Sequence, residues 1–232
     1  SNLGIEKKVP NLPSVFIGSF ELSPYQAIQA YQTIADDGFY TPLRSIRQIR
    51  ETSGEIEFSY PYSVEQRMRP EPITLLKFAL QQTFLTGTAR GYSKKDIDKW
   101  NAGGKTGTSD DQRDSWFVGF AGDILVLVWL GFDDNRPTVL TGRTGAFQVW
   151  KNFINDINPV PTEKTKLQRI QYVWTDIDDG LLSGKSCRNS LLVPFIQGTE
   201  PIKVPNVRKK CFTKNPSNNG CLLYTSDAAD DC

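Results

Sequence analysis

The chain has 232 residues, enough to bury one sizeable hydrophobic core, so one domain with a tail is expected. Its formal net charge of +1 gives no reason to expect a nucleic-acid partner. The absence of histidine excludes Ser-His-Asp and Cys-His mechanisms and most zinc sites. We therefore expect no metal and no cofactor, and any acyl-transfer chemistry must use lysine as its base.

The first part of the chain is typical of a helix followed by a hairpin. Ser23-Pro24-Tyr25-Gln26 forms a capping box with proline at the first helical position, and apolar residues then recur at helical spacing until Gly38. Residues 40–50 and 55–60 alternate in polarity around Ser53-Gly54, which predicts a small peripheral hairpin with a structural role.

A second helix and a charged segment follow. Arg69-Pro70-Glu71-Pro72 interrupts the chain, and residues 73–84 then carry an apolar helical face that ends at Gly87. The short charged run from Ser93 to Lys99 is interpreted as a solvated loop.

The pattern after residue 100 predicts an antiparallel sheet and a last helix. The expected strands cover about residues 103–109, 115–121 and 123–132, and their short connections favour antiparallel neighbours. The apolar run Ile124–Leu130 is far shorter than a membrane helix requires. Residues 142–155 return to a helical pattern, and the polar, proline-rich composition after Pro159-Val160-Pro161 favours a linker and a poorly structured tail.

The candidate site lies in the strand that carries Lys105-Thr106-Gly107-Thr108. Because side chains alternate along a strand, Thr106 and Thr108 share one face, and Gly107 presents bare backbone on the other. A substrate carboxylate or carbonyl laid along this ledge could accept bonds from both hydroxyls and from a free backbone N–H. The Lys105 ammonium would add positive potential beside it.

The Lys105-Thr106-Gly107 sequence allows two other interpretations. A lone K-T-G also occurs as a lysine beside an ordinary glycine-rich turn. A P-loop would need a glycine five positions before Gly104, where this chain has Lys99, and a following helix, which Gly107 opposes.

Several segments around Lys105 resemble the penicillin-binding transpeptidases. K-T-G-T followed by Asp114-Ser115-Trp116-Phe117-Val118-Gly119 looks like the third active-site motif of that family. The resemblance to class A (bifunctional) penicillin-binding proteins covers residues 10–158 and includes residues 12–18, 22–27 and 31–35, Gly87-Thr88-Ala89-Arg90, residues 128–133, Thr141-Gly142 and Gly145-Ala146. Residues 180–187 resemble the C-terminal extension of the 1B-type branch.

The resemblance implies an α+β fold, with an antiparallel sheet flanked by helices as in penicillin-binding proteins and serine β-lactamases. It is expected to be incomplete and to end in an irregular C-terminal tail. Residues 1–158 would be the C-terminal part of a transpeptidase domain, and residues 159–220 a linker and extension. Residues 221–232 contain L-L-Y-T-S-D-A-A-D-D, interpreted as the translation of a sequencing adapter that packs on nothing.

The family cleaves a D-Ala-D-Ala bond of a peptidoglycan stem peptide by acyl transfer to serine, using the motifs S-x-x-K, S-x-N and K-T-G. No S-x-x-K occurs in this sequence, and the one S-x-N, Ser217-Asn218-Asn219, falls in the polar tail. The sequence is therefore interpreted as N-terminally truncated and inactive alone. The alternative is a complete, non-catalytic binding or structural module of the same fold, which the reading frame of the source DNA would distinguish.

Carried over from the family, Lys105 would supply positive potential to the substrate carboxylate, and Thr106 and Thr108 would bond it. The backbone N–H of Thr108 would form half of the oxyanion hole. The resemblance also implies stem peptides and a lipid-linked precursor as substrates, β-lactams as inhibitors, and a location at the periplasmic face of the inner membrane through an anchor outside this chain. An outer-membrane lipoprotein activator and division or elongation proteins are further expected partners.

The cysteines indicate how the tail is held. Cys187 and Cys211 lie in a loop-rich region without C-x-x-C spacing, which argues against zinc and favours a disulfide between them. Two unpaired thiols are the alternative, and the 1B-type extension would also account for Cys211. Cys221 and Cys232 bracket the adapter-like segment.

Overall fold

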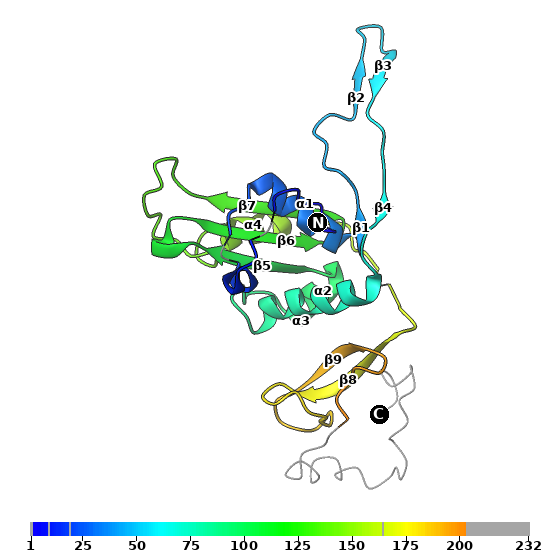
Figure 1. Cartoon of the computed structure of the whole chain (residues 1–232), viewed down its shortest axis with the longest axis vertical. Helices are drawn as coiled ribbons and strands as arrows, with labels where there is room; N and C mark the ends of the chain where they lie inside the picture. Colours follow the sequence, from blue (N-terminus) through cyan, green and yellow to red (C-terminus); the bar gives the residue numbers. More distant parts are fainter. Residues whose placement is uncertain (1, 9, 19, 164, 203–232) are drawn as a thin grey trace. The chain divides into compact units, whose positions relative to one another are not determined.

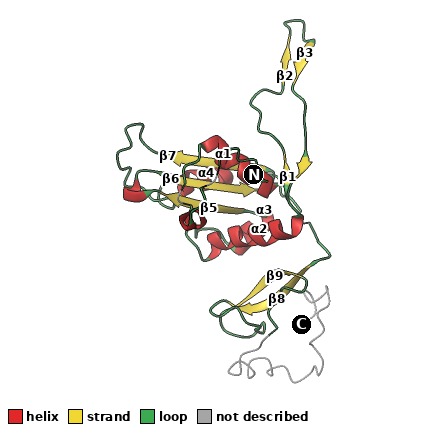
Figure 2. Cartoon of the chain, in the orientation of Figure 1, coloured by secondary structure: helices red, strands yellow, loops and turns green. Residues whose placement is uncertain are grey.

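The computed structural model describes residues 2–8, 10–18, 20–163 and 165–202. Its contacts divide the chain into two units, Ser1–Lys164 and Thr165–Cys232. The first unit contains a three-stranded sheet with helices around it, and the second contains a two-stranded sheet (Figures 1 and 2). The fold is therefore α+β with antiparallel sheets, as the sequence predicts.

The central sheet consists of β5 (Gly103–Thr108), β6 (Ser115–Ala121) and β7 (Ile124–Leu130), in that order. Both strand pairs are antiparallel, and Thr108 lies opposite Ser115, which in turn lies opposite Leu130. Within the described residues β5 pairs only with β6, so β5 is an edge strand. The predicted strands and their antiparallel order are confirmed.

Helices cover the two faces of this sheet. Phe117 and Ala121 of β6 belong to a buried cluster with Trp150 and Ile154 of α4 (Ala146–Ile157). Phe120 points the other way, because side chains three residues apart in a strand lie on opposite faces. It packs with residues from two further helices, Ile34 of α1 (Pro24–Ala35) and Ile73 and Leu80 of α2 (Pro70–Leu85).

The helix starts follow local chemistry. Ser23 and Gln26 form the predicted capping box at α1. The sequence pattern predicts that Pro70 and Pro72 interrupt the chain before the second helix. In the structure they lie instead in the first turn of α2. Proline is tolerated there because the first helical N–H groups have no intrahelical acceptor to bond. Lys77 of α2 joins the end of α1 by an ion pair of 2.7 Å with Asp37.

The charged run at residues 93–99 was expected to be a solvated loop, and this expectation is wrong. It forms α3 (Lys94–Trp100), capped by reciprocal bonds between Ser93 and Asp96. Ile97 and Trp100 are buried in the same cluster as α4, so the helix exposes its charges and buries one face. The sequence prediction failed because it weighed the charged residues and overlooked Ile97 and Trp100, two apolar residues at helical spacing.

A small hairpin and a second strand pair follow α1. Strands β2 (Gln48–Arg50) and β3 (Ile56–Ser59) pair antiparallel, and all their residues are exposed. Figure 1 shows this hairpin extending away from the sheet of its unit. Strands β1 (Phe39–Tyr40) and β4 (Glu65–Gln66) pair at its base. The predicted peripheral hairpin is confirmed.

The second unit corrects the expectation of a poorly structured tail. Strands β8 (Ile170–Asp176) and β9 (Ser190–Ile196) form an antiparallel pair over their full length. Pro194 is accommodated because Gln197 donates its N–H to the Arg169 carbonyl, so by alternation the nitrogen of Pro194 faces away from β8. The proline content hid this pair in the sequence.

Cys187 lies in this unit, buried and disulfide-bonded. Cys211, Cys221, Cys232 and the adapter-like segment 221–232 lie outside the described residues, so the pairing of Cys187 with Cys211 stays a prediction. Ser217-Asn218-Asn219 also lies outside them. No helix in the described part of the chain is long and apolar enough to cross a membrane.

Candidate active site

One edge of the K-T-G strand β5 has no strand partner among the described residues. Ser109 donates its N–H to the Asp114 carbonyl at 3.2 Å, so backbone groups of odd-numbered residues face β6. The backbone N–H and C=O groups of even-numbered residues face away from β6. The Gly104 carbonyl follows this rule, because it accepts the Thr83 hydroxyl of α2 at 2.6 Å. By the same alternation, the N–H of Thr108 points to the open edge, where an oxyanion could accept it.

The Lys105 ammonium lies at this edge. Its Nζ donates to the Thr106 carbonyl at 2.8 Å and lies 3.4 Å from the Thr106 hydroxyl. Partial burial lowers the pKa of Lys105 from its ordinary value, because desolvation disfavours the charged amine. The cation is therefore held within reach of one of the two ledge hydroxyls.

Thr106 and Thr108 lie on one face of the strand, as the alternation predicts, and each has a specific partner. The hydroxyl of Thr106 is 2.6 Å from that of Thr88, which follows the end of α2. The hydroxyl of Thr108 accepts the N–H of Gly142 at 2.8 Å, so its own proton remains available to an acceptor. The strand thus presents one ammonium and two oriented hydroxyls.

The turn that carries Gly142 docks closely on the strand. A Cβ at Gly142 would lie 2.6 Å from the Gly107 carbonyl oxygen and 2.9 Å from the Cβ of Thr106, so only glycine fits there without displacing the backbone. Thr141 and Thr144 bond each other reciprocally and form the turn. Because of this turn, α4 begins at Ala146 rather than at residue 142 as expected from the sequence.

Ser115 of β6 forms hydrogen bonds to the turn at residues 141–145 and to the first residue of α4. Its hydroxyl donates to the Thr141 carbonyl at 2.8 Å and accepts the N–H of Ala146 at 2.9 Å, and the residue is fully buried. Ser115 lies directly opposite Thr108. One buried serine therefore connects the start of α4 to the end of the K-T-G strand.

The loop between β5 and β6 is closed by Asp114. Ser109 donates its hydroxyl to the Asp114 carboxylate at 2.8 Å, and the indole of Trp129 donates to the other carboxylate oxygen at 2.9 Å. Residues 109–114 contain the 3-10 turn η2 (Asp110–Gln112). This arrangement fixes where β5 ends, and a sequence pattern cannot show it because Trp129 lies two strands away.

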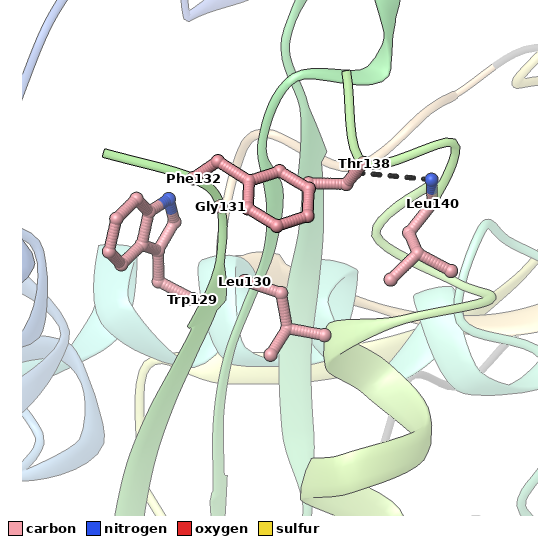
Figure 3. A pocket seen from close by; sticks show the side chains of 6 residues that line it. All are labelled: Trp129, Leu130, Gly131, Phe132, Thr138 and Leu140. Atoms are coloured by element: carbon pink, nitrogen blue, oxygen red, sulfur yellow. Dashed lines mark hydrogen bonds between the residues drawn. The ribbon is translucent and has the colours of Figure 1, made fainter. Parts of the chain in front are cut away.

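A pocket of about 260 Å³ opens at the end of β7, but it is not the candidate site. Figure 3 shows its lining residues, with the Leu140 N–H donating to the Thr138 hydroxyl at 3.1 Å. The walls are mostly apolar and are formed by Trp129, Leu130, Gly131, Phe132, Thr138 and Leu140. None of the four K-T-G-T residues lines it, so the site is defined by the edge of β5.

Sequence reasoning placed all four site residues on one strand, but it missed two of the side chains that support them. Thr83 contacts the Gly104 carbonyl, and Asp114 closes the loop. The local signal for Thr83 is that its hydroxyl lies directly next to the buried Phe84 in the sequence of α2. In the described residues no cluster of three or more potential metal ligands occurs.

Comparison with known proteins identifies the family. Residues 9–134 match the penicillin-binding protein transpeptidase domain, more than half of the chain. The chain therefore belongs to this family. It is 39% identical over 151 residues to penicillin-binding protein 1B of Haemophilus influenzae, covering 65% of this chain and 19% of that protein. It is 37% identical over 153 residues to penicillin-binding protein 1B of Vibrio cholerae, covering 66% and 20%.

The fold is shared with a crystal structure of penicillin-binding protein 1A from Haemophilus influenzae. The TM-score is 0.66 at 22% sequence identity, over 82% of this chain and 34% of that one. The chain spans about a fifth of the length of the two 1B relatives. It is thus similar to a limited part of each of these proteins.

Proposed function

We propose that this chain forms the K-T-G wall of a D,D-transpeptidase cleft in a class A penicillin-binding protein of the 1B-like branch. The observation that carries the proposal is the joint placement of one ammonium and two hydroxyls at an open strand edge. Lys105 would attract the terminal carboxylate of a D-Ala-D-Ala stem peptide, and Thr106 and Thr108 would donate to it. The Thr108 N–H would stabilise the oxyanion that forms when the scissile carbonyl is attacked.

The nucleophile is assigned to another part of the protein. In the proposed reaction a serine hydroxyl, deprotonated by the lysine of S-x-x-K, attacks the carbonyl of the penultimate D-Ala. The terminal D-Ala leaves as a protonated amine, and an amine on a neighbouring strand then captures the acyl group. Neither S-x-x-K nor a suitably placed S-x-N is among these 232 residues, so this chain alone is expected to be inactive.

The wider setting follows from the family and is part of the same proposal. The complete protein would act at the periplasmic face of the inner membrane through an anchor outside this chain. It would also carry a glycosyltransferase that uses the lipid-linked precursor, and β-lactams would inhibit the transpeptidase. A lipoprotein activator and division or elongation proteins are the proposed partners.

Labelling with a fluorescent penicillin tests the proposal. The full-length protein recovered from the source DNA should be labelled at one serine, and the 232-residue chain should not be labelled. Lys105→Ala in the full-length protein should slow labelling by more than about a hundredfold, the typical cost of removing a transition-state electrostatic contact. Lys94→Ala is the matched control, because Lys94 pairs with Asp98 on the exposed side of α3.

Two results would contradict this function. Stoichiometric labelling of the isolated chain would place a nucleophile among the present residues. Labelling of the Lys105→Ala protein at the wild-type rate would show that the strand is an ordinary structural edge.

A further inference from the structure

The turn after α2 brings one more hydroxyl to the candidate site. Thr88 lies 2.6 Å from Thr106 through their two hydroxyl oxygens, and either atom can be the donor. Figure 1 shows α2 running beside β5, which places this turn at the free edge of the K-T-G strand. Thr88 lies outside the K-T-G-T strand, although this contact ties it to a ledge hydroxyl.

The position of Thr88 is well defined by the backbone on both sides. Ala89 is fully buried and donates its N–H to the Thr83 carbonyl at 3.1 Å. A Cβ at Gly87 would lie 2.7 Å from the Cα of Thr83, so glycine lets the turn fold back against the last turn of the helix. Thr83 in turn contacts the Gly104 carbonyl at 2.6 Å. The same helix end therefore holds both the strand and Thr88.

The direction of the hydroxyl contact decides what Thr106 can offer to a ligand. A threonine hydroxyl has one proton and two lone pairs, and the Lys105 ammonium can only donate. If Thr88 also donates to Thr106, both lone pairs of Thr106 are used, and its proton must point to another acceptor. If Thr106 donated to Thr88 instead, it would have no proton left for a carboxylate.

We propose that Thr88 is a positioning residue that donates its hydroxyl proton to Thr106 and thereby directs the Thr106 proton toward the carboxylate of the substrate. This inference rests on the proposed function, since it concerns the same ledge. Thr88 acts through Thr106 and need not touch the substrate itself. Its contribution should therefore depend on the presence of a carboxylate in the ligand.

Two penicillin probes separate this role from a general structural one. The first carries its free carboxylate, and the second is the methyl ester of the same compound. Acylation rate constants for both are measured on the full-length protein, as wild type, Thr88→Val, Thr88→Ser and Thr86→Val. Thr86 is the matched control, because its hydroxyl lies near the Gln82 carbonyl at the same helix end and contacts no ledge residue in the described hydrogen bonds.

Loss of one hydrogen bond predicts that Thr88→Val acylates about threefold to tenfold more slowly with the free acid. Its rate with the ester should stay within about twofold, because the ester carbonyl is an uncharged and weaker acceptor than the carboxylate. Thr88→Ser should restore the free-acid rate, and Thr86→Val should leave both rates unchanged. The acid-to-ester ratio within one variant does not depend on the folded fraction, so partial misfolding does not obscure the result.

An equal slowing with both probes, or no slowing with either, would overturn the role of Thr88 while leaving the proposed function standing. A serine variant that behaves like valine would also overturn it. A wild-type protein that is not labelled by the free acid would overturn the proposed function itself, and this inference with it.

Discussion

Substitution of Thr108 by valine tests how the K-T-G strand is joined to the turn at residues 141–145. Valine keeps the β-branched shape and the backbone N–H of Thr108 but removes the hydroxyl that accepts the Gly142 N–H at 2.8 Å. Gly142 is buried, and the Gly107 carbonyl and the Cβ of Thr106 occupy the space beside it. The other end of the bond is more open, because Thr108 is exposed and the bond is only partly buried, so water can replace part of the lost acceptor.

The expected cost follows from this burial. A buried N–H left without an acceptor costs about 1 to 3 kcal/mol, and because this bond is only partly buried, Thr108→Val should lower the free energy of unfolding by an amount near the lower end of that range. Thr106→Val is the matched comparison on the same face. In the described part of the chain, the hydroxyl of Thr106 bonds to the side chains of Thr88 and Lys105, and both residues lie at the surface, where water can solvate them after the change. Its cost should stay below about 1 kcal/mol.

Urea unfolding of the chain, followed by tryptophan fluorescence, measures both changes. Hydrogen exchange of the Gly142 amide gives a local reading, and it should accelerate in Thr108→Val and not in Thr106→Val. If the two variants unfold within about 0.5 kcal/mol of wild type, the range of ordinary surface substitutions, the turn does not depend on Thr108 and the reasoning is refuted.

Two further predictions concern Ser115 and Lys105. Ser115→Ala leaves the Ala146 N–H without its acceptor, while the Thr141 carbonyl keeps its bond from the Gly145 N–H at 2.9 Å. The variant should therefore destabilise the chain by about 1 to 3 kcal/mol in urea unfolding, whereas the exposed Ser45→Ala should change little. Equal stability of the two variants would contradict the role of Ser115. Because burial lowers the pKa of Lys105 from 10.5 in the folded chain, the unfolded chain binds more protons between the lowered pKa and 10.5, and folding stability should rise with pH across that window. Carboxylate binding should weaken over the same window, and an NMR titration in which Lys105 ionises at or above 10.5 would disprove this.

Local patterns in the sequence were sufficient for several elements. The Ser23 and Gln26 capping box marked the start of α1, and the apolar run in β7 marked a strand, although most of its residues are partly buried rather than buried. These predictions succeeded because capping and strand alternation depend on residues only a few positions apart. The pattern failed at α3 and at β9, where charges and Pro194 masked apolar positions that pack against other elements.

The sequence by itself determined that Lys105, Thr106, Gly107 and Thr108 lie on one strand and that the two threonines share a face. Only the tertiary structure decided what each hydroxyl contacts. Thr88 is 18 residues from Thr106, and Gly142 is 34 residues from Thr108. Contacts over such separations depend on how α2 and the turn before α4 pack on the sheet, and no local periodicity encodes that packing.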